Sequence, residues 1–103
     1  MTVVGADRLV QFGSEHADAA AALAAWRQTV AAATWRNPAD VRRTYGSADP
    51  VVPVASGRRV AVFNIRGNRY RLVAAVDYQL GICNVLRVMT HEEYGRNRWK
   101  DVL

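Results

Sequence analysis

The spacing of hydrophobic residues changes near the middle of the chain. Residues 17–33 are mostly helix formers with apolar side chains at helical spacing, which predicts a helix that buries Ala19, Leu23, Trp26, Val30 and Ala33. After residue 50, short apolar runs alternate with turn residues, as is typical of strands. The pattern therefore predicts an α+β protein in which the helices come first.

Two further helices are expected in the N-terminal half. Asp7 is placed to cap a helix whose apolar face carries Leu9, Phe12 and His16, and we interpret His16 as structural. The segment from Asn37 to Asp40 is typical of a helix start, because it offers an N-cap side chain, a proline at the first helical position and an acid in the first turn. This third helix is expected to end by Gly46.

The later part of the chain contains several expected strands. They lie at Val51–Val54, Val60–Ile65, Tyr70–Tyr78 and Ile82–Met89, and a short first strand is expected at Thr2–Val4. Pro53 favours an edge or irregular position for its strand. Gly67-Asn68 separates two of the strands and predicts a tight hairpin turn that tolerates positive φ.

This hairpin predicts a specific register. With Gly67-Asn68 as the loop, the opposing pairs are Phe63 with Leu72, Asn64 with Arg71, Ile65 with Tyr70 and Arg66 with Arg69. The apolar pairs are expected to pack on the helices, and the polar pairs to share the other face. Arginines directly opposite each other repel, so we expect an anion across them. The alternative is a solvated, charged hairpin tip.

Charge is distributed unevenly along the chain. Residues 1–57 carry five basic and five acidic residues, whereas residues 58–100 carry nine basic residues against three acids. These segments contribute 0 and +6, and Asp101 brings the total to the net charge of +5. A basic face of this kind attracts polyanions, with nucleic acid or an acidic protein as the candidates.

Composition limits the remaining function classes. At 103 residues the chain is expected to form a single domain, residues 1–103. No metal centre or cofactor is expected, because one cysteine and two distant histidines do not match a metal-ligand pattern. Cys83 is interpreted as a small buried hydrophobe. No membrane span or signal peptide is expected, and the protein is expected to be cytoplasmic.

The segment Thr90-His91-Glu92-Glu93-Tyr94 supplies candidate chemistry beside the basic residues. An unperturbed imidazole titrates near ~6.5 and can exchange a proton at neutral pH. RNA can be cut when a base activates its 2′-hydroxyl and cations stabilise the phosphate, and arginine binds two phosphate oxygens at once. The alternative for His91 is a helix cap or an ordinary surface residue.

Two motifs give a specific resemblance. The segment from Val62 to Leu72 resembles the FNI-x-GN-x-YRL segment of the HigB family of bacterial toxins, and residues 90–94 resemble its TH-x-x-Y segment. Similarity extends in order over roughly residues 8–100. The resemblance implies a RelE/ParE-like fold, with N-terminal helices packed on a small, mostly antiparallel sheet.

The resemblance also implies an activity and a site. It implies the toxin of a type II toxin–antitoxin pair, a metal-independent endoribonuclease that cuts mRNA on the ribosome, and a HigA-like helix-turn-helix antitoxin as partner. The implied catalytic residues are Arg71, His91 and Tyr94. The candidate RNA-binding residues are Asn64, Arg66, Asn68, Arg69, Arg87 and Lys100. Many members have Asp after the tyrosine, where this chain has Gly95.

Two other functions remain open at this stage. A basic face can block translation by holding RNA or the ribosome without cutting, and relatives in the superfamily attack other targets such as gyrase. A titratable residue at His91 favours cutting over binding alone.

Overall fold

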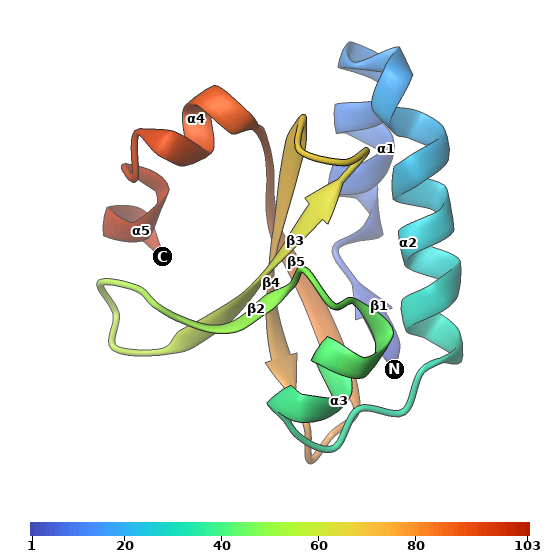
Figure 1. Ribbon diagram of the computed structural model, residues 1–103, viewed down its shortest axis with the longest axis vertical. Coiled ribbons are helices and arrows are strands. Elements are labelled where there is room, and N and C mark those ends of the chain that lie inside the picture. Colours follow the sequence, from blue (N-terminus) through green and yellow to red (C-terminus); the bar gives the residue numbers. More distant parts are fainter.

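One five-stranded sheet organises the protein, which a computed structural model describes over residues 1–103 (Figure 1). Its strands lie in the order β1-β5-β4-β3-β2. Their bounds are Thr2–Val4 for β1, Asp49–Pro53 for β2, Arg59–Ile65 for β3, Tyr70–Asp77 for β4 and Ile82–Thr90 for β5. Only β1 pairs in parallel, with β5, so the expected α+β fold with a mostly antiparallel sheet is confirmed.

Helices lie on both sides of this sheet (Figure 1). The N-terminal layer consists of α1 (Ala6–Glu15), the short 3-10 helix η1 (Ala17–Ala19) and α2 (Ala20–Ala32), and α3 (Pro38–Thr44) lies at one end of the sheet. Two short helices, α4 (His91–Gly95) and α5 (Trp99–Val102), follow β5 on the opposite side. The sequence pattern did not predict α4 and α5.

The larger core lies between the N-terminal helices and the sheet. Phe63 is its centre, because the rings of Trp26, Trp35 and Tyr45 lie 5.4, 5.9 and 5.5 Å from it. The buried face predicted for a helix over residues 17–33 is confirmed at four of its five positions, although residues 17–19 form η1, and Ala33 follows α2 and is only partly buried. Cys83 is fully buried here, and burial raises the pKa of its thiol to about 12, so it behaves as a hydrophobe.

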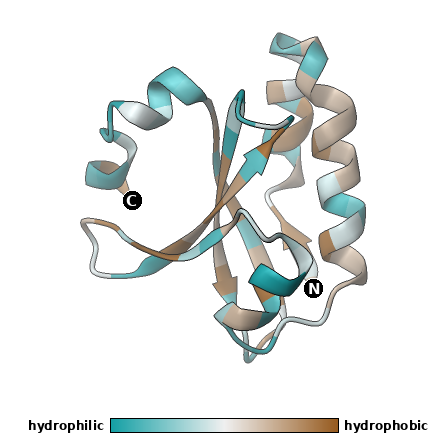
Figure 2. Cartoon of the chain, in the orientation of Figure 1, coloured by the Kyte–Doolittle hydropathy of each residue, from teal (hydrophilic) through white to brown (hydrophobic).

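A second, smaller core lies on the other face of the sheet. Buried side chains from β3, β4 and β5 pack there against Trp99 of α5 and the segment around β2; the cluster consists of Val52, Val54, Val60, Val62, Val73, Met89 and Trp99. Hydrophobic colouring runs along the central strands, while the exposed parts of α4 and α5 are largely hydrophilic (Figure 2). The sheet is therefore buried on both faces near its middle.

The sequence predicted the N-cap residue of α3 correctly and that of α1 wrongly. Asn37 caps α3 as predicted, since its side-chain oxygen accepts the N–H of Asp40 at 3.0 Å. The prediction that Asp7 caps α1 is wrong, because the N-cap is Gly5 with φ of 81° and Asp7 lies in the first turn. A Cβ at Gly5 would lie 2.7 Å from the carbonyl oxygen of Val85, so both conformation and space require glycine.

The structural reading of His16 is confirmed. Its ring stacks on Phe12 with the centroids 4.2 Å apart and lies 5.4 Å from the ring of Tyr70. None of the helices has the length and hydrophobicity that a membrane-spanning helix requires.

Candidate nucleic-acid interface

The β3–β4 hairpin has the predicted register. Phe63 pairs with Leu72, Asn64 with Arg71, and Ile65 with Tyr70. The apolar members belong to the larger core, on the side of the N-terminal helices. Asn64 and Arg71 therefore lie on the opposite face, which α4 and α5 approach.

Arg66 and Arg69 do not join that face, contrary to the prediction. Both guanidinium groups bind the carboxylate of Asp18 in η1, at 2.5 Å for Arg66 and 3.2 Å for Arg69. The hydroxyl of Tyr70 donates to the same carboxylate at 2.6 Å. The anion expected across the two arginines is thus supplied by the chain itself. Sequence reasoning missed Asp18, because no local pattern connects residues about fifty positions apart.

The turn at the hairpin tip also differs from the expectation. The residues in the left-handed region are Arg66, with φ of 50°, and Gly67, with φ of 63°. For a residue other than glycine this conformation costs roughly 1–2 kcal/mol. Arg66 is therefore held in a strained conformation while its side chain binds Asp18.

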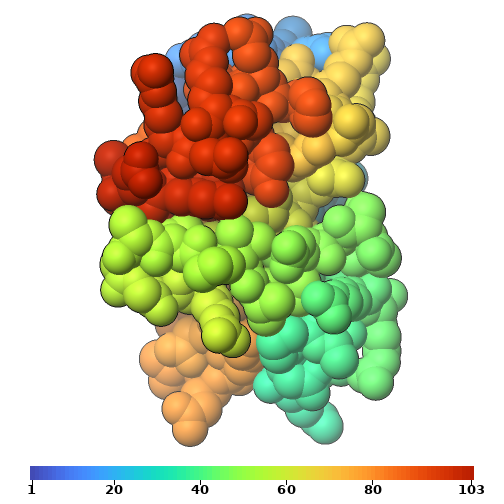
Figure 3. All heavy atoms as spheres, turned by 60° about the vertical axis from the view of Figure 1, so that its left-hand side comes forward, coloured from blue at the N-terminus to red at the C-terminus, as the bar shows by residue number.

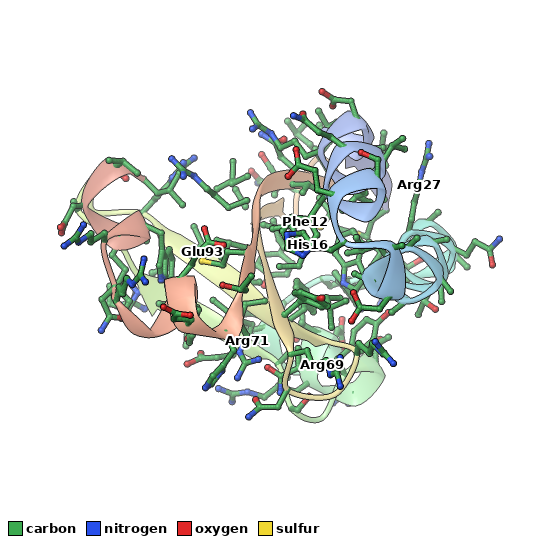
Figure 4. The ribbon with its side chains drawn as sticks, turned by 90° about the horizontal axis from the view of Figure 1, so that it is seen from above. Phe12, His16, Arg27, Arg69, Arg71 and Glu93 are labelled. Carbon is green, nitrogen blue, oxygen red and sulfur yellow. The ribbon has the colours of Figure 1, made fainter.

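Arg71 is the only charged side chain that is buried, with a residual exposure of 7%. Its Nη1 donates to the main-chain oxygens of Asn68 and Tyr70, at 3.1 and 3.2 Å. Its Nη2 donates to the side-chain oxygen of Asn68. The guanidinium carbon lies 5.2 Å from the centre of the Tyr94 ring. In Figure 4, Arg71 lies between the hairpin and the C-terminal helices, whereas Arg69 lies at the hairpin tip.

No carboxylate neutralises Arg71. The chain contains four ion pairs, made by Arg43, Arg66, Arg69 and Arg96, and none includes Arg71. A buried charge without a counterion is costly, and arginine cannot become neutral in a protein. Carbonyl oxygens and an aromatic face offset part of this cost. An incoming anion would offset more of it, so the surroundings of Arg71 favour the binding of an anion.

A row of aromatic and basic side chains continues from Arg71. The rings of Tyr94 and Trp99 stack with their centroids 5.4 Å apart, and the ammonium of Lys100 lies 5.5 Å from the Trp99 ring. The main-chain oxygen of Lys100 accepts the N–H of Ala55 at 2.9 Å, which attaches α5 to the loop between β2 and β3. Figure 3 shows the C-terminal segment lying directly against this loop. Three of the predicted site residues, Arg71, Tyr94 and Lys100, are thereby brought together. Trp99, which was not predicted as a site residue, contacts both Tyr94 and Lys100.

The turn around His91 has a structural role that the sequence interpretation missed. Thr90 and Glu93 form a capping box at the start of α4, in which the Glu93 N–H donates to the Thr90 hydroxyl at 3.1 Å and the Glu93 carboxylate accepts the Thr90 N–H at 3.3 Å. The Thr-x-x-Glu spacing was a visible signal for it. None of these bonds uses the imidazole of His91, which is exposed. The main-chain N–H of His91 donates to the Arg69 oxygen at 2.9 Å, so the turn is attached to the hairpin tip.

Arg87 lies farther along the sheet from the hairpin tip. It is opposite Val73, two positions along β4 from Arg71, on the same face. It lines a pocket of about 290 Å³ together with Glu93, Arg96, Arg98 and Trp99. The structure therefore divides the predicted site into four parts: Arg71 with Asn64, Asn68, Tyr94 and Lys100; Arg66 and Arg69 on Asp18; Arg87 farther along the sheet; and His91, which is exposed and attached to the hairpin tip by its main chain.

The sheet order, the N-terminal helical layer and the basic face beside the β3–β4 hairpin define an α+β protein with the expected RelE-like architecture. The family model of the HigB toxins, the RelE-like toxic component of a toxin–antitoxin system, matches residues 19–97. Because this match covers most of the chain, the protein belongs to the HigB toxin family. No curated protein matches the chain with significant similarity.

Proposed function

We propose that this toxin is an endoribonuclease that cuts mRNA on the translating ribosome through attack by the RNA's own 2′-hydroxyl. The observation that carries the proposal is Arg71, a buried cation with no counterion at the end of a row of aromatic and basic side chains. A phosphate placed against Arg71 would receive a charged donor, and a base would meet the partly exposed ring of Tyr94 and the adjacent basic side chains.

The proposed reaction requires two proton transfers. A base removes the proton from the 2′-hydroxyl, the oxygen attacks the adjacent phosphorus, and the bond from phosphorus to the 5′-oxygen breaks. An acid protonates the departing 5′-oxygen, so the products carry a 2′,3′-cyclic phosphate and a 5′-hydroxyl. His91 and Tyr94 are the candidates for these transfers, and a positioned acid–base group contributes roughly 10²–10⁴-fold.

In this proposal the remaining residues bind and orient the RNA. Arg71 stabilises the negative charge that develops on the phosphate. Asn64, Asn68 and Lys100 contact the strand near the cut, and Arg87 contacts it farther away. Arg66 and Arg69 contribute less than an unpaired arginine, because Asp18 already neutralises part of their charge.

The decisive experiment supplies the purified toxin with translating ribosomes and a defined mRNA. The 5′ and 3′ ends of the products are then identified, and the same mRNA is tested with a single 2′-deoxyribose at the cut. Cutting is expected only with the ribose, and it should leave a cyclic phosphate. Cleavage of the deoxy substrate would show that the mechanism is wrong.

A second candidate function is supported by the capping box. Thr90 and Glu93 cap α4, and this structural role accounts for both residues without a catalytic function. None of the hydrogen bonds in this turn orients the imidazole of His91. The toxin would then block translation by binding alone. The variant His91→Gln, which keeps a neutral polar side chain but cannot titrate, separates these functions. Under the endonuclease proposal it keeps ribosome binding and loses cutting.

A further inference from the structure

A single carboxylate joins the hairpin tip to the N-terminal helical layer. Asp18 accepts hydrogen bonds from Arg66, Arg69 and Tyr70, which lie 48, 51 and 52 residues away in sequence. Apart from Asp18, the ion pairs of the chain connect residues only three or four positions apart. Asp18 immediately precedes residue 19, where the family match begins.

These contacts differ from an ordinary surface ion pair. Isolated exposed pairs contribute little, because solvent screens them and two flexible side chains must be ordered. Here one carboxylate accepts three donors, and one of them belongs to the buried Tyr70, whose ring packs edge-on against Phe12 at 5.4 Å. Arg66 also keeps a left-handed backbone, with φ of 50°, while it makes the contact. Several independent features therefore fix the tip in one position.

The tip in turn holds Arg71. Asn68 lies in the turn between Arg66 and Arg69. Its main-chain and side-chain oxygens both accept hydrogen bonds from the guanidinium of Arg71. The Arg69 carbonyl also accepts the main-chain N–H of His91. The path from Asp18 to Arg71 thus runs through the ion pairs of Arg66 and Arg69, the four-residue turn that carries them, and the hydrogen bonds of Asn68.

We infer that Asp18 is a positioning residue that fixes the hairpin tip, so that Asn68 holds Arg71 in place, and that it neutralises Arg66 and Arg69, so that they add little to RNA binding. The positioning part rests on the proposed function. The neutralising part concerns binding alone and does not require that the toxin cuts RNA.

The two roles predict opposite effects of removing the carboxylate. Two freed arginines would add phosphate contacts, so RNA binding should become tighter at low salt and more sensitive to salt. A loosened tip would misplace Arg71, so cutting should become slower. If Asp18 only stabilised the fold, its removal would not be expected to increase RNA binding.

The test compares Asp18→Asn with Asp7→Asn. Both substitutions remove one negative charge from the N-terminal helical region, but Asp7 makes no ion pair. Binding of a labelled single-stranded RNA is measured as a function of salt. For Asp18→Asn, the magnitude of the log–log slope should rise by about 1.4, since each phosphate contact contributes about 0.7. Asp7→Asn should leave the slope near that of the wild type.

The cutting rate is measured on translating ribosomes in single turnover. Asp18→Asn should cut on the order of tenfold more slowly, although it binds RNA more tightly, because a small misplacement of a catalytic group is costly. Tyr70→Phe removes one of the three donors and leaves both arginines bound. It should slow cutting less and leave the salt slope unchanged. Asp18→Glu, which restores the charge, should return the slope toward that of the wild type.

An NMR measurement keeps the positioning role testable without cleavage. The side-chain N–H signal of Arg71 should shift in Asp18→Asn and remain unchanged in Asp7→Asn. An unchanged salt slope would overturn neutralisation, and unchanged cutting together with an unchanged Arg71 signal would overturn positioning. A wild-type protein that cuts no RNA would overturn the proposed function instead, and the slope and the NMR signal would still decide the role of Asp18.

Discussion

Three arginines of one hairpin have different environments, although they lie within six residues of each other in sequence. Arg66 and Arg69 are exposed and share Asp18, whereas Arg71 is buried and has only neutral oxygens and an aromatic ring around it. Their value for binding an anion depends on these neighbours. An arginine that is paired with a carboxylate must give up that ion pair before it can bind another anion. Arg71 has no ion pair to give up.

Replacement of Arg71 is expected to weaken toxicity far more than replacement of Arg27. Loss of a charged hydrogen bond to the phosphate should cost ~1.5–3 kcal/mol, or roughly ten- to a hundredfold in rate. Arg27→Ala is the matched control, because Arg27 is exposed on α2, away from the hairpin (Figure 4). Growth after induction is measured at equal protein levels. Equal effects of the two substitutions would place the site elsewhere.

The Asp18 contacts predict a dependence of stability on acid pH. The hydrogen bond from Tyr70, followed by the bonds and charges of Arg66 and Arg69, lowers the pKa of Asp18 below its ordinary value of 3.8. A lowered pKa stabilises the fold above the ordinary value, and this contribution disappears as pH falls through the lowered pKa. The difference in unfolding free energy between wild type and Asp18→Asn should therefore be constant near neutrality and shrink below about pH 4.

Urea unfolding at several pH values measures this difference. The groups that face Asp18 are Arg66, Arg69 and Tyr70, of which only Tyr70 titrates, and its hydrogen bond to Asp18 raises its pKa above 10.0. Tyr70→Phe should therefore reduce the acid dependence, since it removes the largest cause of the shift. A difference between wild type and Asp18→Asn that persists unchanged down to strong acid would contradict this account.

At the scale of the elements, the sequence predicted correctly those features that depend on residues close together in the chain. The hairpin register follows from alternation around a glycine turn, and the Asn37 cap follows from its own side chain. The N-cap of α1 is a glycine because the main chain there has positive φ and passes close to Val85, which the sequence does not show. Helices α4 and α5 are too short to show helical periodicity. The Asp18 contacts form only when α1, η1 and α2 pack on the sheet, so no local pattern in the sequence predicts them.

The capping box predicts separate effects for neighbouring residues of one motif. Thr90→Ala should remove a cap of α4 and cost about 1 kcal/mol of stability. It should also slow cutting, because α4 carries Tyr94 over Arg71. His91→Gln changes no bond of the box, so it should leave stability close to that of the wild type. Urea unfolding of both variants checks this, and a large loss of stability in His91→Gln would identify the histidine as structural.

At the scale of the whole molecule, the sheet separates two environments. The N-terminal helices cover one face and supply Asp18, while α4 and α5 cover part of the other through Trp99 and place Tyr94 over Arg71. Both layers therefore act on the same hairpin, one from each side. The charge asymmetry of the sequence is only partly available to a polyanion, because Asp18 and Glu92 pair with three of the basic residues.

RNA binding should therefore depend on salt less steeply than the basic composition suggests. On β4, β5 and the C-terminal segment, four cations make no ion pair, namely Arg71, Arg87, Arg98 and Lys100. Four contacts of about 0.7 each give a log–log slope with a magnitude of about 2.8, or a roughly fiftyfold loss of affinity between 50 and 200 mM salt. Fluorescence anisotropy with a single-stranded RNA measures the slope. Weak binding at physiological salt would agree with a need for the ribosome to present the mRNA. Tight binding that is insensitive to salt would contradict phosphate contacts by these side chains.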